Sequence, residues 1–173
     1  MKQEINLWEY AGHILEQTGK GALLTTQAEG QVNTMTIAWG TLGIEWGKPI
    51  YTVFVRQSRH TKTLLDKTGE FTVNIPMGEI DKNILSVCGT KSGRDIDKFA
   101  QLGLTREVGQ TVSVPGIRQL PLTLECKVLY KQDQVLDSID PASRSRYYAA
   151  GTANENDYHT AYYGLITAAY IIK

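Results

Sequence analysis

The sequence predicts a mainly β protein, folded as a closed or partly closed antiparallel barrel with short helices between the strands. Three runs rich in β-branched or aromatic residues lie close together at residues 32–39, 50–55 and 71–75, and each is bounded by Gly, Pro, Ser or Asn. The helical patterns are short and do not alternate regularly with these runs. That arrangement argues against a parallel sheet covered by helices on both faces.

Further strands bring the expected number to about six. Residues 22–26 predict a first short strand, which a turn at 28–31 joins to the next strand. Alternating apolar residues predict a strand at 122–130, and an aromatic, β-rich run predicts the last strand at 162–172. Residues 40–49 are rich in glycine, and we expect them to form a loop.

Short helices are expected where apolar residues recur at helical spacing. Asn6 is placed to cap the first helix, and Gly19 and Gly21 are placed to end it. Ser58 is the expected cap of the helix that follows the strand at 50–55. The expected helices lie at residues 7–17, 61–67, 80–88 and 96–102, with a helical turn at 140–143.

The composition is that of one globular domain spanning residues 1–173, with 42% hydrophobic and 21% charged residues. Because 18 basic residues balance 18 acidic ones, nothing marks the chain for nucleic acid or for an anionic membrane. The first residues are too polar for a signal peptide, and no apolar run approaches the roughly 20 residues of a membrane span. The two cysteines form no metal-binding cluster. We therefore expect a reduced, cytoplasmic protein.

The densest cluster of basic and hydroxyl side chains is residues 56–62, where a strand gives way to a helix. The free N–H groups of a helix N-terminus, together with arginine and hydroxyl groups, favour an anion such as a phosphate. The same pattern is also typical of an ordinary capped helix with a solvated basic turn. We treat His60, inside this segment, as a surface residue.

A second segment, residues 88–95, resembles a phosphate-binding loop in composition. Gly89 and Gly93 allow a close backbone approach to a ligand, and Lys91 and Arg94 add positive charge. The segment lacks the spacing of a Walker motif and of a dinucleotide-binding fingerprint. Taken alone, it does not identify a ligand.

Residues on either side of this loop have structural interpretations. Cys88 is expected to be a small buried packing residue rather than a nucleophile. Asp95, Asp97 and Lys98 are expected to form a helix cap and exposed ion pairs.

Five motifs follow one another along the chain and together point to one family. They are Asn33-Thr-Met-Thr-Ile-x-Trp-Gly, Gly43-Ile-Glu-Trp-Gly-Lys-Pro, Val55-Arg-x-Ser-Arg-x-Thr-Lys, Gly69-Glu-Phe-Thr-Val-Asn-Ile-Pro and Gly89-Thr-Lys-Ser-Gly-Arg-Asp-x-Asp-Lys-Phe. In this order they resemble the flavoredoxin group of the flavin reductase-like family. The similarity runs from roughly Gly21 to the end of the chain.

The resemblance implies an antiparallel six-stranded FMN-binding split barrel with Greek-key connections, and a homodimer with the flavin near the subunit interface. Backbone groups of residues 33–39 would meet the polar edge of the isoalloxazine ring, residues 56–62 would hold the phosphate, and residues 91–93 would close over the flavin. A positive charge there suits the negative charge that develops on the ring during reduction. The residues assigned to FMN are Asn33, Thr34, Met35, Thr36, Trp39, Arg56, Ser58, Arg59, Thr61, Lys62, Lys91, Ser92 and Gly93.

The C-terminal segment resembles the terminal His and Gly pattern of the same family. His159 and Tyr163 are the expected substrate residues there. His159 is equally a candidate for a purely structural hydrogen bond.

Two functions stay open. In the first, NAD(P)H reduces FMN, which passes electrons to an acceptor such as free flavin or a ferric complex. Because no dinucleotide fingerprint is present, the nicotinamide would have to stack on the flavin in an open cleft. In the second, the protein is a non-enzymatic FMN electron carrier that a protein partner reduces. An activity like that of pyridoxamine-phosphate oxidases, whose barrel is related, is a weaker third alternative.

Overall fold

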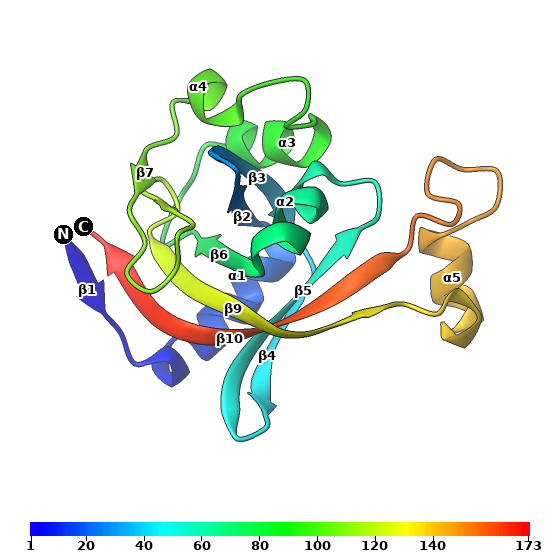
Figure 1. Cartoon of the computed structure of the whole chain (residues 1–173), viewed down its shortest axis with the longest axis horizontal. Helices are drawn as coiled ribbons and strands as arrows, with labels where there is room; N and C mark the ends of the chain where they lie inside the picture. The colour runs from blue at the N-terminus through cyan, green and yellow to red at the C-terminus, as the bar shows by residue number, and fades with distance from the viewer.

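The computed structural model describes residues 1–173 and contains mostly β-strands, with short helices around them (Figure 1). The strands are β1 (Lys2–Glu4), β2 (Ala22–Ala28), β3 (Gln31–Ile37), β4 (Gly40–Glu45), β5 (Lys48–Arg56), β6 (Glu70–Ile75), β7 (Arg106–Glu107), β8 (Gly116–Ile117), β9 (Leu122–Asp133) and β10 (His159–Ile172). The α-helices are α1 (Ala11–Lys20), α2 (His60–Thr68), α3 (Lys82–Thr90), α4 (Lys98–Leu102) and α5 (Pro141–Tyr147), and the 3-10 helices are η1 (Leu7–Glu9) and η2 (Leu136–Ser138).

Eight strands form one antiparallel sheet in the order β3-β2-β6-β9-β10-β5-β4, with β1 paired to β10. The two end strands, β3 and β4, follow each other in sequence, yet they are not paired by hydrogen bonds. The barrel is therefore split between β3 and β4. The mainly β, antiparallel prediction is confirmed, although β1, β4, β7 and β8 were not expected.

The expected loop at residues 40–49 was wrong, because it forms β4, a two-residue turn and the start of β5. The central residues of the turn, Trp46 and Gly47, have φ angles of 52° and 68°. Positive φ at both positions is typical of the type I′ turn that matches the twist of paired strands. Tryptophan is not a residue that normally predicts this turn, so the sequence signal was weak.

The interior of the barrel is a core of 18 buried residues, to which α1 and most of the long strands contribute. Leu24, Val53, Phe71 and Leu124 belong to it and are completely buried. A second cluster of seven buried residues lies outside the barrel and joins the sheet to α3 and α4. Cys88 belongs to this second cluster, which confirms that it is a buried packing residue.

Two of the expected helix caps have different outcomes. The side chain of Asn6 accepts a hydrogen bond from the Trp8 backbone N–H, as expected, but it caps η1, which a break at Tyr10 separates from α1. Ser58 does not cap α2, whose N-cap is Arg59 and has no side-chain hydrogen bond. The hydroxyl of Ser58 donates instead to Asp157 over 2.7 Å.

The pair formed by β9 and β10 is the longest in the sheet and extends beyond the barrel as an arm that carries α5 (Figure 1). The pairing shifts register at Gly164, where the strand must bend. A Cβ atom at Gly164 would lie 2.4 Å from the ring of Phe71, so only glycine fits there. None of the helices is long and apolar enough to cross a lipid bilayer.

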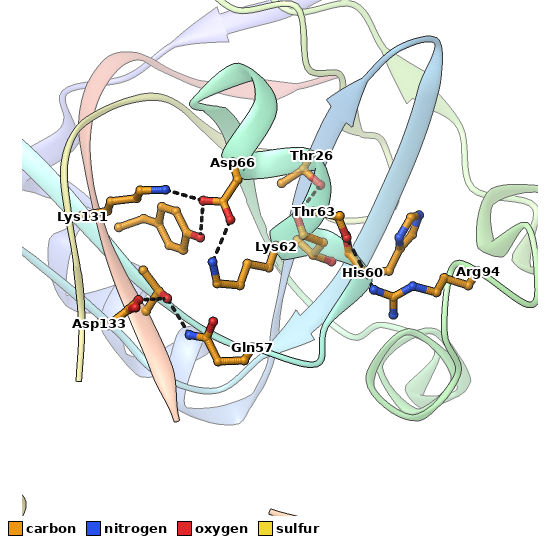
Figure 2. Close-up of polar contacts among 12 residues, drawn as sticks. Thr26, Gln57, His60, Lys62, Thr63, Asp66, Arg94, Lys131 and Asp133 are labelled. Atoms are coloured by element: carbon orange, nitrogen blue, oxygen red, sulfur yellow. Dashed lines mark hydrogen bonds and ion pairs between the residues drawn. The ribbon is translucent and has the colours of Figure 1, made fainter. Parts of the chain in front are cut away.

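Asp66 joins α2 to this pair of strands (Figure 2). Its carboxylate accepts hydrogen bonds from Lys62 and Lys131 over 2.7 Å each and from the Tyr162 hydroxyl over 2.8 Å. Burial alone raises the pKa of Asp66, but these three hydrogen bonds outweigh it and lower the pKa from 3.8 to about 2. The charged form of Asp66 is therefore the form that stabilises the fold.

We expect Asp66→Asn to lower the free energy of unfolding by about 1 kcal/mol at neutral pH. Because the folded-state pKa lies below the unfolded one, this stabilisation is complete above about pH 4 and is lost as the pH falls toward about 2. Urea unfolding of both proteins across this range measures the difference. A difference that does not shrink in acid would show that the charge of Asp66 contributes nothing.

Candidate functional site

A cavity of about 190 Å³ lies at the split in the barrel, where the chain leaves β3. We call it the aromatic cavity. The last residues of β3 form one wall, and Trp39 packs its ring 4.9 Å from the rings of both Tyr147 and His159. The lining residues are Met35, Thr36, Ile37, Ala38, Trp39, Phe54, Arg56, Arg59 and His159.

A second cavity, of about 140 Å³, lies between the start of α2 and the loop that follows α3. We call it the cationic cavity, because Arg59, Lys91, Arg94 and Lys98 line it and no carboxylate does. The other lining residues are Asn33, Met35, Ser58, His60, Thr61, Cys88, Thr90, Ser92 and Gly93. Positive charge without a carboxylate partner, beside backbone and hydroxyl donors, is a site for an anion.

The two cavities adjoin, since Met35 and Arg59 line both. The loop after α3 closes the cationic cavity by pressing against β3. A Cβ atom at Gly93 would lie 2.0 Å from the Asn33 side-chain oxygen, so any other residue here would displace the Asn33 side chain. The result is a continuous site that is polar and cationic at one end and largely apolar and aromatic at the other.

The predicted residues of β3 divide according to the alternation of a strand. Asn33 and Met35 face the cavities, and the Asn33 amide donates to the Thr61 hydroxyl over 2.8 Å. Thr34 points the other way and donates to the Leu24 carbonyl, so its side chain reaches neither cavity. Thr36 lines the aromatic cavity while its hydroxyl donates to the Leu85 carbonyl over 2.6 Å.

Arg56 does not reach the cationic cavity and lines the aromatic one instead. Its guanidinium donates to the carbonyls of Asp157 over 2.7 Å and of Tyr147 over 3.2 Å. Together with the bond between Ser58 and Asp157, these contacts tie β5 to the segment that follows α5. Two N–H groups of Arg56 are thus used by the protein, and its guanidinium lies beside the aromatic cavity rather than in the cationic cavity, where the phosphate was expected.

Lys62 also lies away from the cationic cavity. Figure 2 shows its side chain turned toward Asp66, whereas His60 and Arg94 lie on the other side of the first turn of α2. The reason is the helical spacing, which places Lys62 and Asp66 four residues apart on one face. The prediction that Lys62 holds a phosphate is therefore not supported by its position.

Five residues that were not assigned to the FMN site line the cationic cavity, and three of them, His60, Arg94 and Lys98, have basic side chains; the other two are Cys88 and Thr90. His60 was expected at the surface, but its Nδ1 is buried and has no hydrogen-bond partner. Burial lowers the pKa of His60, and the charges of Arg94 and Lys98 lower it further. The sequence had indicated Arg94 by its charge in the segment that resembles a phosphate-binding loop, whereas the only signal for His60 was its position between two predicted ligands.

Lys98 was expected to form an exposed ion pair and instead is only 4% exposed. Its ammonium group donates to the carbonyls of Thr34 over 2.8 Å and of Cys88 over 2.9 Å. Burial lowers the pKa of Lys98, and no carboxylate pairs with it. The expected cap nearby is confirmed, because the Asp97 side chain accepts from the Ala100 backbone N–H.

His159 is 6% exposed and lines the aromatic cavity, with its Nδ1 2.6 Å from the Tyr148 hydroxyl. Burial and then the charge of Arg56 lower its pKa to about 4, so the imidazole is neutral at physiological pH. Tyr163 lies outside both cavities, with its ring 5.3 Å from that of Tyr130. The structure therefore brings His159, but not Tyr163, to the candidate site.

Solved structures with the same fold have low sequence identity to this chain. A flavoredoxin from Methanosarcina acetivorans matches with a TM-score of 0.65 and 23% identity, over 88% of this chain and 68% of that one. An FMN-binding domain of flavin reductase-like enzymes from Shewanella baltica matches with a TM-score of 0.68 and 17% identity, over 99% and 77%. At this identity the two matches establish the split-barrel fold alone.

Two curated relatives are uncharacterized proteins. One, from Archaeoglobus fulgidus, is 33% identical over 97 residues, which are 56% of this chain and 54% of that protein. The other, YddH from Escherichia coli, is 32% identical over 98 residues, which are 56% of this chain and 51% of YddH. The chain thus matches about half the length of each.

The flavin reductase like domain, as a family model, matches residues 18–172 of this chain. That match includes every strand that builds the two cavities and the loop that closes the cationic one. The chain therefore belongs to the flavin reductase-like family.

Proposed function

We propose that the protein is an FMN-dependent oxidoreductase, with FMN held across the two adjoining cavities. One observation carries the proposal: a cavity with four cationic side chains and no carboxylate adjoins a cavity with aromatic and apolar walls. A ligand with a flat aromatic ring at one end and a phosphate at the other matches this combination of properties. The FMN-binding names of several structural neighbours agree with it.

The phosphate fits the cationic cavity on the chemistry of its walls. Arg59, Lys91, Arg94 and Lys98 supply charge, and the hydroxyls of Thr61 and Ser92 supply further polar contacts. The buried Nδ1 of His60 lacks a partner, and a phosphate oxygen would provide one. A phosphate dianion would also compensate the uncompensated charge of Lys98.

The ring fits the aromatic cavity for complementary reasons. Met35, Ile37, Ala38 and Phe54 provide apolar contacts, and Trp39 provides an aromatic wall. The backbone after Ile37 has left the sheet, so its N–H and C=O groups can pair with the polar edge of the ring. Bound FMN supplies the chemistry, because it accepts electrons from one partner and passes them to another.

We further propose NAD(P)H as the electron donor and a free flavin or a ferric complex as the acceptor. Two structural neighbours with reductase names support an enzymatic role, namely an NADH:FAD oxidoreductase from Streptomyces globisporus and the flavin reductase PheA2. The flavoredoxin neighbours support the second candidate, a non-enzymatic electron carrier. The open split of the barrel beside Trp39 favours the enzyme, since it leaves one side of the cavity accessible.

We expect Arg59→Ala to weaken FMN binding by about ten- to a hundredfold, because a hydrogen bond to a charged group contributes roughly 1.5–3 kcal/mol. Fluorescence titration of the purified protein with FMN measures the effect. Riboflavin, which has no phosphate, should bind the variant and the parent protein almost equally. An equal loss for both ligands would show that Arg59 does not contact the phosphate.

Lys62→Ala is the matched control for this titration. It removes one positive charge three residues further along, from a side chain that pairs with Asp66 outside the cavity. We expect its affinity for FMN to equal that of the parent protein.

The choice between enzyme and carrier depends on the rate of reduction. We expect NADH or NADPH to bleach the absorbance of protein-bound FMN in a stopped-flow experiment, with a rate that saturates as the donor concentration rises. Saturation is the sign that the donor binds beside the flavin. Bound FMN that is reduced no faster than free FMN would favour the carrier.

We propose that the protein forms a homodimer through an exposed aromatic surface formed by β4, the turn that follows it, β9 and β10. Trp46 and Tyr130 are 55% and 44% exposed, with ring centroids 6.3 Å apart, and Tyr130 lies beside Tyr163. Ile44, which is 71% exposed, extends this surface along β4. Clustered exposed apolar side chains mark a contact surface, and a second copy of the chain is the partner that the family resemblance implies.

We expect the parent protein to be a dimer at micromolar concentration and Trp46→Glu to be a monomer, because the charge would be buried without a partner. Sedimentation velocity measures both. Trp8→Glu is the control, since Trp8 is 50% exposed but lies on η1, outside this surface. A monomeric parent protein would overturn the proposed dimer.

A further inference from the structure

A chain of hydrogen bonds leads from the end of β9 to His159. The Tyr148 hydroxyl lies 2.8 Å from the side-chain oxygen of Gln134 and 2.6 Å from Nδ1 of His159. The backbone also joins the two ends, because the Gln134 N–H donates to the His159 carbonyl over 2.9 Å. The His159 backbone N–H donates in return to the Gln134 side-chain oxygen over 3.3 Å.

The hydrogen bond from the His159 N–H to Gln134 determines the direction of the two side-chain hydrogen bonds, between Gln134 and Tyr148 and between Tyr148 and His159. A backbone N–H can only donate, so the atom of Gln134 that it meets must be the amide oxygen and not the amide nitrogen. An amide oxygen can only accept, so Tyr148 uses its one hydroxyl hydrogen on Gln134. The Tyr148 oxygen must then accept from His159, and Nδ1 of His159 therefore carries a proton.

The protonation state of Nε2 follows from that of Nδ1. A neutral imidazole has a single N–H, so Nε2 of His159 is a bare acceptor. Burial and the Arg56 charge keep the ring neutral, because they lower its pKa to about 4. Nε2 has no hydrogen-bond partner within the protein, and His159 lines the aromatic cavity.

We propose that Gln134 and Tyr148 are positioning residues that hold His159 in the Nδ1–H form, so that Nε2 accepts a hydrogen bond from an amide N–H bound in the aromatic cavity. The imide of the flavin ring and the carboxamide of a nicotinamide both offer such a group. The bound amide rests on the proposed function, whereas the state of His159 in the free protein does not. A histidine with the proton on Nε2 would instead meet the ligand N–H with a second donor.

The first experiment records the ¹⁵N chemical shifts of the His159 ring in the ligand-free protein. We expect the shift of an unprotonated nitrogen at Nε2 in the parent protein. In Gln134→Met, Tyr148 loses its acceptor and turns its hydroxyl hydrogen toward Nδ1, so the proton should move to Nε2. Gln134→Glu keeps an acceptor oxygen and should keep the parent form.

A matched control lies on the same arm. Gln132 accepts a hydrogen bond from the Tyr130 hydroxyl over 2.8 Å, but both residues lie outside the aromatic cavity. Gln132→Met should leave the shifts of His159 unchanged. A proton on Nε2 in the parent protein, or no change in Gln134→Met, would overturn the inference.

The second experiment identifies the amide. We expect Gln134→Met to weaken one binding step by about two- to tenfold, the range for a single neutral hydrogen bond, and Gln134→Glu to restore it. A higher Kd for FMN assigns the flavin imide, and an unchanged Kd with a higher KM for NAD(P)H assigns the carboxamide. Tyr148→Phe, which also removes the acceptor of Nδ1, should change the same constant.

The failures of the two proposals are distinguishable. If the proton moves in Gln134→Met but neither constant changes, Nε2 does not accept from the ligand and the inference is overturned. If the parent protein binds no FMN, the proposed function is overturned, and the bound amide with it, while the ¹⁵N shifts still decide how His159 is held.

Discussion

The pairing of β9 with β10 is the interaction on which the rest of the structure depends. These two strands lie near the centre of the sheet order, with β6, β2 and β3 on one side and β5 and β4 on the other. Their register shifts at Gly164 and again near Ala168, and these irregularities let one long pair contribute to the barrel and to the arm. The same register brings the residue after β9, Gln134, opposite the first residue of β10, His159.

The arm therefore links the fold to the chemistry of the site. Its outer segment carries Tyr147, Tyr148 and Asp157. Tyr147 contacts β5, Tyr148 contacts β10, and Asp157 contacts the turn between β5 and α2. Arg56 serves this link, because its guanidinium holds two backbone carbonyls of the segment. A basic residue in a predicted phosphate turn can thus have a structural task, since the direction of its side chain decides which partner it meets.

Charge separation defines the other end of the site. Acidic residues lie close to the cationic cavity, but none of their carboxylates lines it. Asp97 caps α4, Asp66 pairs with Lys62 and Lys131, and Asp157 accepts from Ser58. Because no carboxylate pairs with Lys98, its buried ammonium group is stabilised by two backbone carbonyls, and an anion bound in the cavity would stabilise it further.

The sequence by itself determined the antiparallel β class and the approximate positions of β2, β3, β5, β6, β9 and β10, because β-branched and aromatic runs bounded by turn residues are local signals. It also located the two segments that line the cationic cavity, since their glycines, hydroxyls and basic residues cluster within a few positions. What it could not decide was which of these side chains face the cavity. Lys62 and His60 are two residues apart in a short helix, so they point in different directions: Lys62 pairs with Asp66 one turn along the helix, and only the packing of α2 on the sheet places His60 beside Gly93.

The tertiary structure alone decided the burial of Lys98, the contacts of Arg56 and the hydrogen-bond partners of His159. Each depends on partners that are distant in the sequence, such as Thr34 for Lys98, Tyr147 for Arg56 and Gln134 for His159. The pattern of neighbouring residues in the sequence indicates their secondary-structure propensity and periodicity. The direction of a hydrogen bond and the desolvation of a charge depend instead on atoms that folding brings together. The elements could therefore be predicted from the chain, and the roles of several side chains within them could not.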